Sequence, residues 1–552
     1  MKNHLGIILL IAAVAAGIVF APIIAPIYWD EIPQYVIGEY SFNQYMSLID
    51  SFFGTSLADP AYSDFENFYD KDYGPVFEVV LVAIGKAAAL IISGFGWDDL
   101  IIMRHIAVYL VFVLGTYGVY SIARVRLGSS YGGLLAAALF FLSPRLFGNA
   151  FYNSKDIVFL SFFVLSVNYV LLAADKRRIG SVLLAALFTA LAVSVRFIGI
   201  FTLFLGVFVW CVSWRRDGCG VRRIAAAAGG FVILTLLLVY AFYPFLWPSP
   251  VARMHDVVFA MSKFTRHSDL IIFDGELTRA SVMPFYVPRW MVLTLPFLFM
   301  AVSLCGQVQA FALVIRRTFR LSLWKNGSEL CDYVTAVLGL APVIVSVFAH
   351  PWLYDGWRHL YFVMPFLSVS AAVGIFSIAS LAGKKANIAL SVMSALAIIE
   401  SLAGIIWFFP YPNCYFNAAA GSNLISKYSL DYAGTSGHEA LVRILSSQKT
   451  FSRPINVASD SINLMVVMPR LGNAMNLVGV KENILPDYVI SGTHELSETE
   501  KSLYHEVSAV TTVGGEVLLR ILAPNENRDR FCKSEPEKCV IDWHCYMVPD
   551  CR

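Results

Sequence analysis

Apolar runs of about twenty residues recur along most of the first 408 positions and alternate with short polar segments. A helix that crosses a bilayer needs about 20 mainly apolar residues, so the pattern predicts a polytopic α-helical membrane protein. A cleaved signal peptide is an alternative for the first run, although that run is longer than a usual signal sequence. We predict eleven spans, which cover residues 4–27, 104–122, 130–144, 157–174, 179–195, 198–213, 224–243, 290–314, 332–349, 360–382 and 386–408.

Clusters of Lys and Arg, such as "DKRR" and "RRTFR", follow every second span and therefore predict which loops face the cytoplasm. With eleven spans all the large basic clusters lie on one side, the N-terminus is cytoplasmic and the C-terminus is outside. The segment 76–96 is also apolar enough to span, but counting it would place the later basic clusters outside. We therefore assign it to a juxtamembrane or re-entrant helix within a long first outer loop, 28–103.

The pattern changes after residue 408. Segments such as "RPINVASD", "PDYVISG" and "EVLLRIL" are short, rich in β-forming residues and separated by turn residues, whereas "SGHEALVRILSS" has helical periodicity. The chain is thus expected to form a membrane-embedded domain, 1–408, and an outer soluble α+β domain, 409–552. It contains no internal repeat of the kind that marks transporters with duplicated halves.

Composition supports the membrane assignment. Hydrophobic residues make up 58% of the chain and charged residues 14%, against about 25% charged residues in soluble proteins. The net charge of +2 predicts no strong attraction to nucleic acid. Four of the nine cysteines crowd the tail and predict disulfides in an oxidising compartment, with three possible pairings, or alternatively a metal site. These four are Cys532, Cys539, Cys545 and Cys551.

With this topology the ionisable residues near the span ends gather on the outer face. Each has a simple interpretation as a marker of the water boundary, an anchor or an interfacial hydrogen bonder. Together they suit a reaction in which a lipid phosphate leaves: cations hold the phosphate, and a carboxylate accepts a proton, an effect worth about 10²–10⁴ in rate. The candidates are Asp30, Glu31, Asp70, Asp72, Arg145, Lys155, Asp156, Arg196, Arg358 and His359.

Several stretches, in order, resemble the type-C glycosyltransferase superfamily, in the branch of the protein O-mannosyltransferases and the bacterial lipid A aminoarabinose transferase. The acid pair after the first span is in "YWDEIPQY", and a Pro-containing first-loop helix is in "YGPVFEVVLVAIGKAAALIISGFG". A second outer acid follows a Pro in "LSPRLFGNAFYNSKDIVF", and "GWRHLYFVMPFL" resembles a late span of bacterial members. The His-Pro-Pro start of the mannosyltransferase helix is replaced by "DYGPVF".

The resemblance implies an inverting transfer of a sugar from a polyprenyl-phosphate donor on the outer side of the membrane, in a bacterial cell envelope. It implies Asp30 as general base, Glu31 as a group that orients the base or the acceptor, and Asp156 as a second-loop acid. It requires no cofactor, although Asp30, Glu31 and Asp156 could hold one divalent cation. The acceptor is a protein Ser/Thr, a lipid-linked glycan or another surface lipid.

Position, rather than a motif, suggests the remaining roles. Arg145, Lys155, Arg196 and Arg358 are expected to bind the donor phosphate. Asp70, Asp72 and His359 are expected to contact the acceptor or the sugar. The competing functions are a lipid or glycolipid transporter or flippase and a non-enzymatic scaffold. Neither of them needs acids and cations gathered at the outer ends of the spans, so this pattern favours the transferase.

Overall fold

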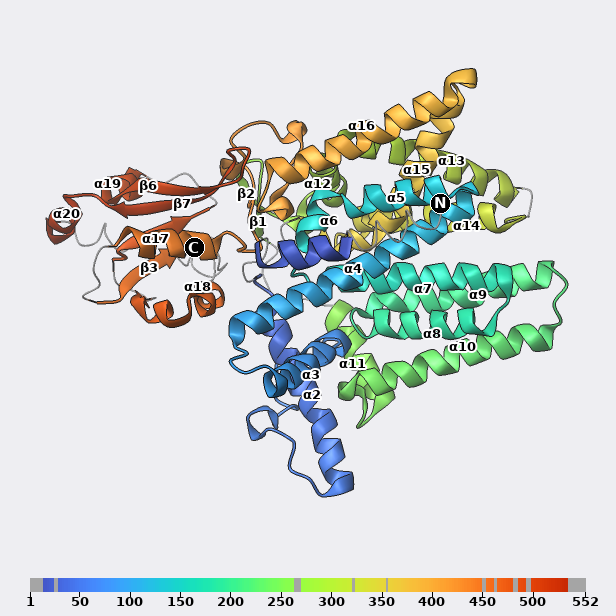
Figure 1. Ribbon diagram of the computed structural model, residues 1–552, viewed down its shortest axis with the longest axis horizontal. Coiled ribbons are helices and arrows are strands. Elements are labelled where there is room, and N and C mark those ends of the chain that lie inside the picture. Colours follow the sequence, from blue (N-terminus) through green and yellow to red (C-terminus); the bar gives the residue numbers. More distant parts are fainter. Residues whose placement is uncertain are drawn as a thin grey trace.

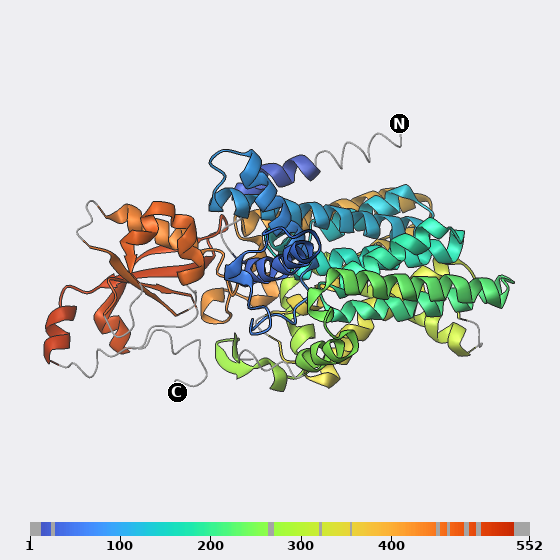
Figure 2. The same ribbon diagram turned by 90° about the horizontal axis from the view of Figure 1, so that it is seen from below.

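A computed structural model describes most of the chain. Its helices form a bundle whose long members lie roughly alongside one another, with a β-sheet region beyond one end (Figures 1 and 2). The described residues are 13–23, 28–262, 270–319, 323–353, 356–448, 453–460, 464–479, 485–492 and 498–534.

Among the described residues, eight helices are long and apolar enough to cross a membrane. They are α4 (Trp97–Leu127), α7 (Asp156–Lys176), α9 (Phe201–Arg216) with η2 (Phe197–Ile200), α10 (Val221–Phe242), α13 (Phe297–Phe319), α14 (Gly327–Ala349), α15 (Met364–Ser380) with η5 (Arg358–Val363), and α16 (Ala386–Trp407) with η6 (Gly383–Lys385). Shorter apolar helices are Ala13–Ile23, α5 (Ser130–Phe141) and α8 (Ile179–Val193).

Every predicted span corresponds to one of these helices, so the polytopic helical fold is confirmed. The number of spans, eleven, stays a prediction because three of the helices are short. One boundary was wrong: the predicted span 290–314 joins the end of α12 (Tyr286–Thr294) to the start of α13. Pro296 lies between the two helices and has no N–H to donate to a continuous helix, which explains the break.

The centre of the bundle is formed by α7 and α15, whose apolar windows are 89% and 83% buried, whereas those of α10 and α16 are only 28% buried. Glycines permit the closest approach of α13 to α15. A Cβ on Gly306 would overlap the carbonyl oxygen of Ser370, and one on Gly374 would overlap that of Val302. Small residues at such crossings let helix backbones pack directly in a membrane.

The first outer loop contains α2 (Glu31–Phe53), η1 (Pro60–Tyr62) and α3 (Val76–Ile91). α2 and α3 pack together, and in Figure 1 they lie below the left-hand part of α4. Arg104 of α4 forms a buried 2.7 Å ion pair with Glu78, which fixes α3 to the bundle. The expected helix over 76–96 is thus present but shorter, and its placement at the membrane surface stays a prediction.

The C-terminal region has a five-stranded mixed sheet of order β4-β3-β5-β7-β6. β3 is parallel to its neighbours β4 and β5, and β7 is antiparallel to the central strand β5 and to β6. The strands are β3 (Ile455–Ser459), β4 (Val478–Gly479), β5 (Tyr488–Ser491), β6 (Tyr504–Thr511) and β7 (Val517–Pro524), and the helices are α17 (Gly437–Ser447), α18 (Leu464–Val467), α19 (Glu498–Leu503) and α20 (Arg528–Ser534). The expected α+β character is confirmed.

The segment between α16 and α17 packs onto the bundle and not into the sheet. Residues 411–417 are all buried. Asn413 lies against Gly148 of α6 (Pro144–Asn149), where a Cβ on the glycine would overlap the Asn413 backbone. The predicted domain boundary at 408/409 follows the end of the last apolar helix and stays a prediction.

A small hairpin and one more helix cover the same end of the bundle. The hairpin is β1 (Leu270–Phe273) and β2 (Glu276–Arg279), and its Phe273 pairs with Tyr428. The helix is α11 (Pro250–Ser262). In the C-terminal tail, Cys532 is disulfide-bonded, whereas Cys539, Cys545 and Cys551 lie outside the described residues, so the pairing stays a prediction.

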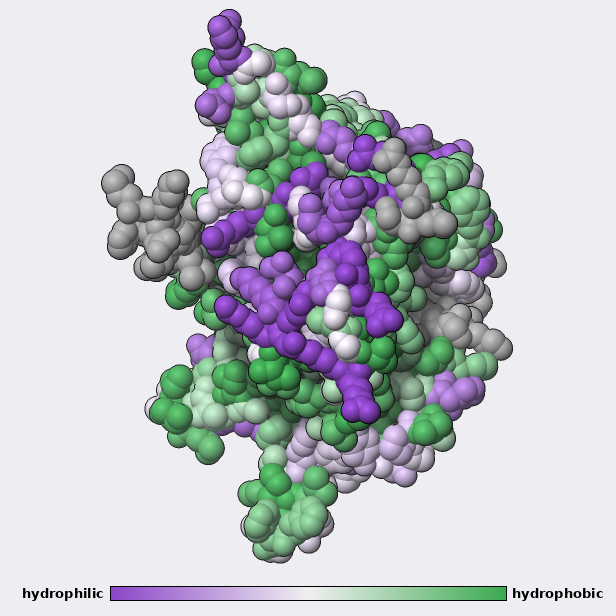
Figure 3. Space-filling model, turned by 90° about the vertical axis from the view of Figure 1, so that its right-hand side faces the viewer, coloured by the Kyte–Doolittle hydropathy of each residue, from purple (hydrophilic) through white to green (hydrophobic). Residues whose placement is uncertain are grey.

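Basic side chains gather at the other end of the bundle. Figure 3 looks onto this end, where hydrophilic residues cluster in the middle of a largely hydrophobic rim. Lys or Arg residues occupy the last turns of α4, α7, α9 and α13, namely Arg124, Arg126, Lys176, Arg215, Arg216, Arg316 and Arg317. The structure therefore places the predicted clusters on one end, and their cytoplasmic assignment stays a prediction.

Candidate active site

The acid pair after the first apolar helix lies in a tight turn, and its two carboxylates point to different partners. Glu31 Oε2 accepts a hydrogen bond from the Tyr28 N–H at 2.9 Å, and Glu31 Oε1 lies 2.8 Å from His105 Nε2 of α4. Both Glu31 and His105 are buried. Asp30 turns instead to Arg358, with Oδ2 2.6 Å from Nη1, and also accepts from the Tyr28 hydroxyl at 3.2 Å.

Asp156 begins α7, and an Asn three residues earlier fixes its orientation. Asn153 Oδ1 accepts from the Asp156 N–H at 2.8 Å, while Asn153 Nδ2 donates to Asp156 Oδ2 at 3.1 Å. A carboxylate in the first turn is also favoured by the helix dipole. Asp156 Oδ1 pairs with Arg196, and Asp156 Oδ2 lies 3.5 Å from Arg358 Nη1.

Arg358 therefore contacts both candidate carboxylates. We call Asp30, Lys155, Asp156, Arg196 and Arg358 the ion cluster. Its members come from four separate parts of the chain: the turn before α2, the start of α7, the residue before η2 and the start of η5. When Lys155 is protonated, three cations and two carboxylates leave one positive charge in excess, which favours an anionic ligand.

The charges in the cluster shift two pKa values outside the predicted spans. Burial raises the pKa of Asp30, but the charges of Arg358 and Lys155 outweigh it and lower that pKa to about 2. Burial, together with the charge of Arg196, lowers the pKa of Lys155 to about 7, against the pull of Asp30 and Asp156. Asp30 is thus an anion at neutral pH, and Lys155 changes charge close to neutral pH.

The first outer loop reaches the cluster through Tyr73. Lys155 Nζ lies 3.7 Å from the ring centroid of Tyr73, a cation–π contact. The Tyr243 hydroxyl donates to the backbone oxygen of Asp72, whose side chain is buried, and Asp70 is half-buried. The predicted acceptor residues Asp70 and Asp72 therefore lie just before Tyr73, the residue that contacts the cluster.

The other predicted residues are divided between the cluster and the packed core. His359 follows Arg358 in η5 and lies close enough to Asp156 to interact with it electrostatically. Arg145 is buried: its Nε donates to the Tyr415 carbonyl at 2.9 Å, and its guanidinium lies 4.8 Å from the Phe416 ring centroid. Arg145 thus holds the segment after α16, and its role toward a phosphate stays a prediction.

Sequence reasoning missed several tyrosines around the cluster. The Tyr28 hydroxyl contacts both Arg358 and Asp30, and its ring stacks on Tyr152 with centroids 5.1 Å apart. The ring centroid of Tyr432 lies 5.8 Å from the Arg358 guanidinium carbon. The Asn153–Asp156 spacing is a local turn signal that could have been used. Tyr432 is far from the other residues in sequence and gives no such signal.

The three residues suggested for a divalent cation do not all converge on one point, because Glu31 points away from Asp30 and Asp156. Within the described part of the chain, no group of three His, Cys, Asp or Glu side chains could hold a metal ion. Glu31 is directed to His105, and both Asp30 and Asp156 are paired with arginine. The idea that Asp30, Glu31 and Asp156 share one ion is therefore not supported by the geometry.

No family model and no curated protein sequence matches the chain. The chain is similar in structure to ArnT from Cupriavidus metallidurans: 12% identity and a TM-score of 0.48 to the apo state, covering 95% of this chain and 98% of that one. ArnT bound to undecaprenyl phosphate has 12% identity and a TM-score of 0.41, covering 94% of this chain and 97% of that one. The Archaeoglobus fulgidus oligosaccharyltransferase tethered to an acceptor peptide has 13% identity and a TM-score of 0.41, covering 94% of this chain and 76% of that one.

The two proteins are named as ArnT and as an oligosaccharyltransferase. The similarity concerns the path of the chain, and the function is argued below from the residues of the ion cluster.

Proposed function

We propose that the protein is an integral membrane glycosyltransferase that moves a sugar from a polyprenyl-phosphate donor to an acceptor at the outer membrane face. The observation that carries the proposal is the ion cluster, in which one guanidinium contacts two carboxylates at the ends of apolar helices. A lipid-linked phosphate would bring its charge to this depth while its tail stays in the bilayer. The excess positive charge would attract it.

Arg358, Arg196 and Lys155 are the proposed phosphate ligands. The two guanidinium groups are held in place by Asp156, which is only 2% exposed and is itself fixed by Asn153. Cations that are already oriented stabilise charge that develops on a leaving phosphate without further reorganisation. Arg145 would support this side of the site through the segment after α16.

Asp30 is the proposed general base. Its side chain is 25% exposed, against 2% for Asp156, so an acceptor arriving from water can reach it. While Asp30 is paired with Arg358, the low pKa of the Asp30 carboxyl makes Asp30 a weak base. A donor phosphate would compete for Arg358 and thereby weaken this ion pair, which raises the basicity of Asp30 in the loaded enzyme.

The proposed step is an inverting displacement. The acceptor oxygen forms a bond to the anomeric carbon and gives its proton to Asp30, while the bond from that carbon to the phosphate oxygen breaks and its electrons go to the polyprenyl phosphate. Glu31 would act indirectly, since it fixes the turn that carries Asp30. Asp70, Asp72 and His359 are proposed to contact the acceptor or the sugar. No cofactor is needed for this step.

Binding of the lipid product tests the phosphate site. Native mass spectrometry of purified protein with added undecaprenyl phosphate should show one retained lipid. Arg358→Gln and Arg196→Gln should lose it, whereas Arg124→Gln, an exposed residue at the other end of the bundle, should retain it. Equal retention in all four proteins would contradict the proposed site.

A further inference from the structure

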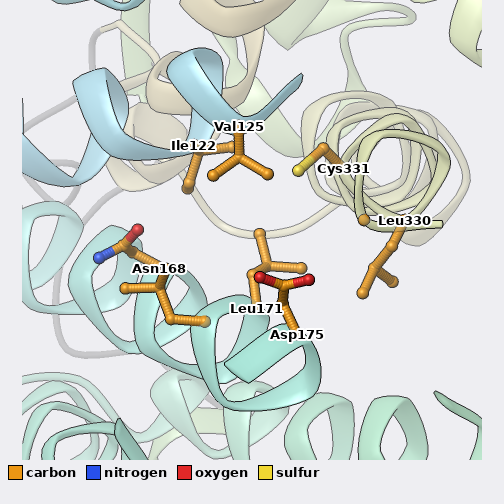
Figure 4. Close-up of a pocket in the computed structure, with 9 residues that line it drawn as sticks. Ile122, Val125, Asn168, Leu171, Asp175, Leu330 and Cys331 are labelled. Atoms are coloured by element: carbon orange, nitrogen blue, oxygen red, sulfur yellow. The ribbon is translucent and has the colours of Figure 1, made fainter. Parts of the chain in front are cut away.

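A pocket lies at the end of the bundle opposite the ion cluster. It is formed between α4, α7 and α14 and opens at the surface of the bundle. Figure 4 shows the Asp175 carboxylate among side chains from all three helices. The pocket is lined by Ile122, Val125, Asn168, Leu171, Leu172, Asp175, Gly327, Leu330 and Cys331.

Within the described part of the chain, two polar groups in this pocket have no hydrogen-bond partner: the buried Asn168 amide nitrogen and the exposed Asp175 carboxylate. Asn168 is 1% exposed, and its Nδ2 has no hydrogen-bond partner among the described residues. Asp175 likewise forms no side-chain hydrogen bond or ion pair within the described part of the chain. The two lie seven residues apart on α7, which places them on one face and roughly 10 Å apart along the helix. Burying an amide N–H without a hydrogen-bond partner costs free energy, so a ligand that accepts a hydrogen bond from Asn168 is favoured.

The neighbouring bases do not use the Asp175 carboxylate. Arg177 pairs with Asp217, Arg126 with Asp332, and Arg317 with Glu329. A single carboxylate at the mouth of an otherwise apolar pocket is complementary to a compact cation that has N–H groups to donate. A primary ammonium group has this chemistry.

The walls indicate that the cation is attached to a lipid. Apart from Asn168 and Asp175 the lining side chains are chiefly aliphatic, and Asn168 lies inside the apolar span of α7. We propose that the pocket binds a phospholipid with a primary-amine headgroup, such as phosphatidylethanolamine, from the leaflet opposite the ion cluster. The ammonium would pair with Asp175, and an ester carbonyl would accept from Asn168 Nδ2. This inference does not rest on the proposed transferase activity.

Lipid titration of the full-length protein in detergent, followed by native mass spectrometry, tests the proposal. Phosphatidylethanolamine, phosphatidylglycerol and phosphatidylcholine with the same acyl chains are compared. The wild type should retain one phosphatidylethanolamine in preference to the other two. Asp175→Asn should weaken that binding by about fivefold, as for a partly exposed ion pair, and remove the preference. Asn168→Leu should weaken the binding of all three lipids.

Two further variants keep the outcome unambiguous. Asp175→Glu retains the charge and should retain the preference. Asp98→Asn removes an exposed acid from the first turn of α4, at the other end of the bundle, and should bind like the wild type. Equal binding of the three lipids, or an unchanged preference in Asp175→Asn, would overturn the proposal. Displacement of the lipid by a soluble amine such as spermidine, bound without any lipid, would overturn the assignment to a lipid.

Discussion

Arg358 is the residue on which the site depends. It contacts Asp30, Asp156 and Tyr28, and it lies near Tyr432 from the segment after the last span. The sequence identified Arg358 and both carboxylates as candidates because ionisable groups are costly at membrane depth. It could not show that one guanidinium serves both acids, because that depends on contacts between positions about 200 and 330 residues apart.

Replacing Arg358 by Gln should reduce both activity and stability. The two carboxylates would lose their shared cation, and removing one partner of a buried ion pair costs roughly 3–5 kcal/mol. Asp30 is partly exposed, so the loss should fall at the lower end of this range. Thermal unfolding in detergent measures the stability. Arg124→Gln is the matched control, and an Arg358→Gln protein as stable as this control would contradict the described network.

The charge of Lys155 should make donor binding depend on pH. Its pKa of about 7 lies far below the usual value because of burial and Arg196, so the ammonium is lost as pH rises through neutrality. If only the charged form holds the phosphate, affinity should fall about tenfold between about pH 6 and pH 8. Titration of a glycosyl phosphodiester donor measures this, and Lys155→Arg should abolish the dependence because arginine stays charged. A wild type with no such change would contradict the role of Lys155.

At the scale of elements, the hydrophobic pattern predicted the helices well because membrane helices must satisfy their backbone hydrogen bonds internally. It failed at Pro296, where a continuous apolar run contains a break between α12 and α13. It assigned 409–552 to a soluble domain, a boundary that stays a prediction, and within this range the segment 411–417 is buried against the bundle. The short helical turns there contain little periodicity, and their tertiary contacts decide where they pack.

Close packing of α13 on α15 gives a prediction at this scale. Gly306→Ala places a methyl group on the Ser370 carbonyl, and overpacking of this kind costs roughly 1–3 kcal/mol. Gly230→Ala in α10 is the control, since a Cβ there meets no atom within 4 Å. Thermal unfolding of both variants should show a clear loss only for Gly306→Ala. Equal stability of the two would mean that the helices are not packed as described.

The whole molecule has two unlike ends. Basic side chains crowd one end of the bundle, and the ion cluster and the β-sheet region lie at the other (Figures 1 and 3). The sheet is attached through the β6–β7 turn, whose Val513 and Gly514 N–H groups donate to the Phe409 and Trp407 carbonyls at 2.9 and 2.7 Å. Charge patterning predicted this polarity, whereas the attachment of the sheet depends on backbone contacts that leave no mark in the sequence.

The central claim is that the ion cluster breaks the bond between a sugar and a polyprenyl phosphate, with Asp30 as base. The most direct measurement incubates purified protein with the glycosyl lipids and acceptors of its own membrane and follows free polyprenyl phosphate by mass spectrometry. The wild type should release it, and folded Asp30→Asn should do so about 10²-fold or more slowly. Full activity in Asp30→Asn, or movement of the glycosyl lipid across the bilayer with that bond intact, would contradict the account.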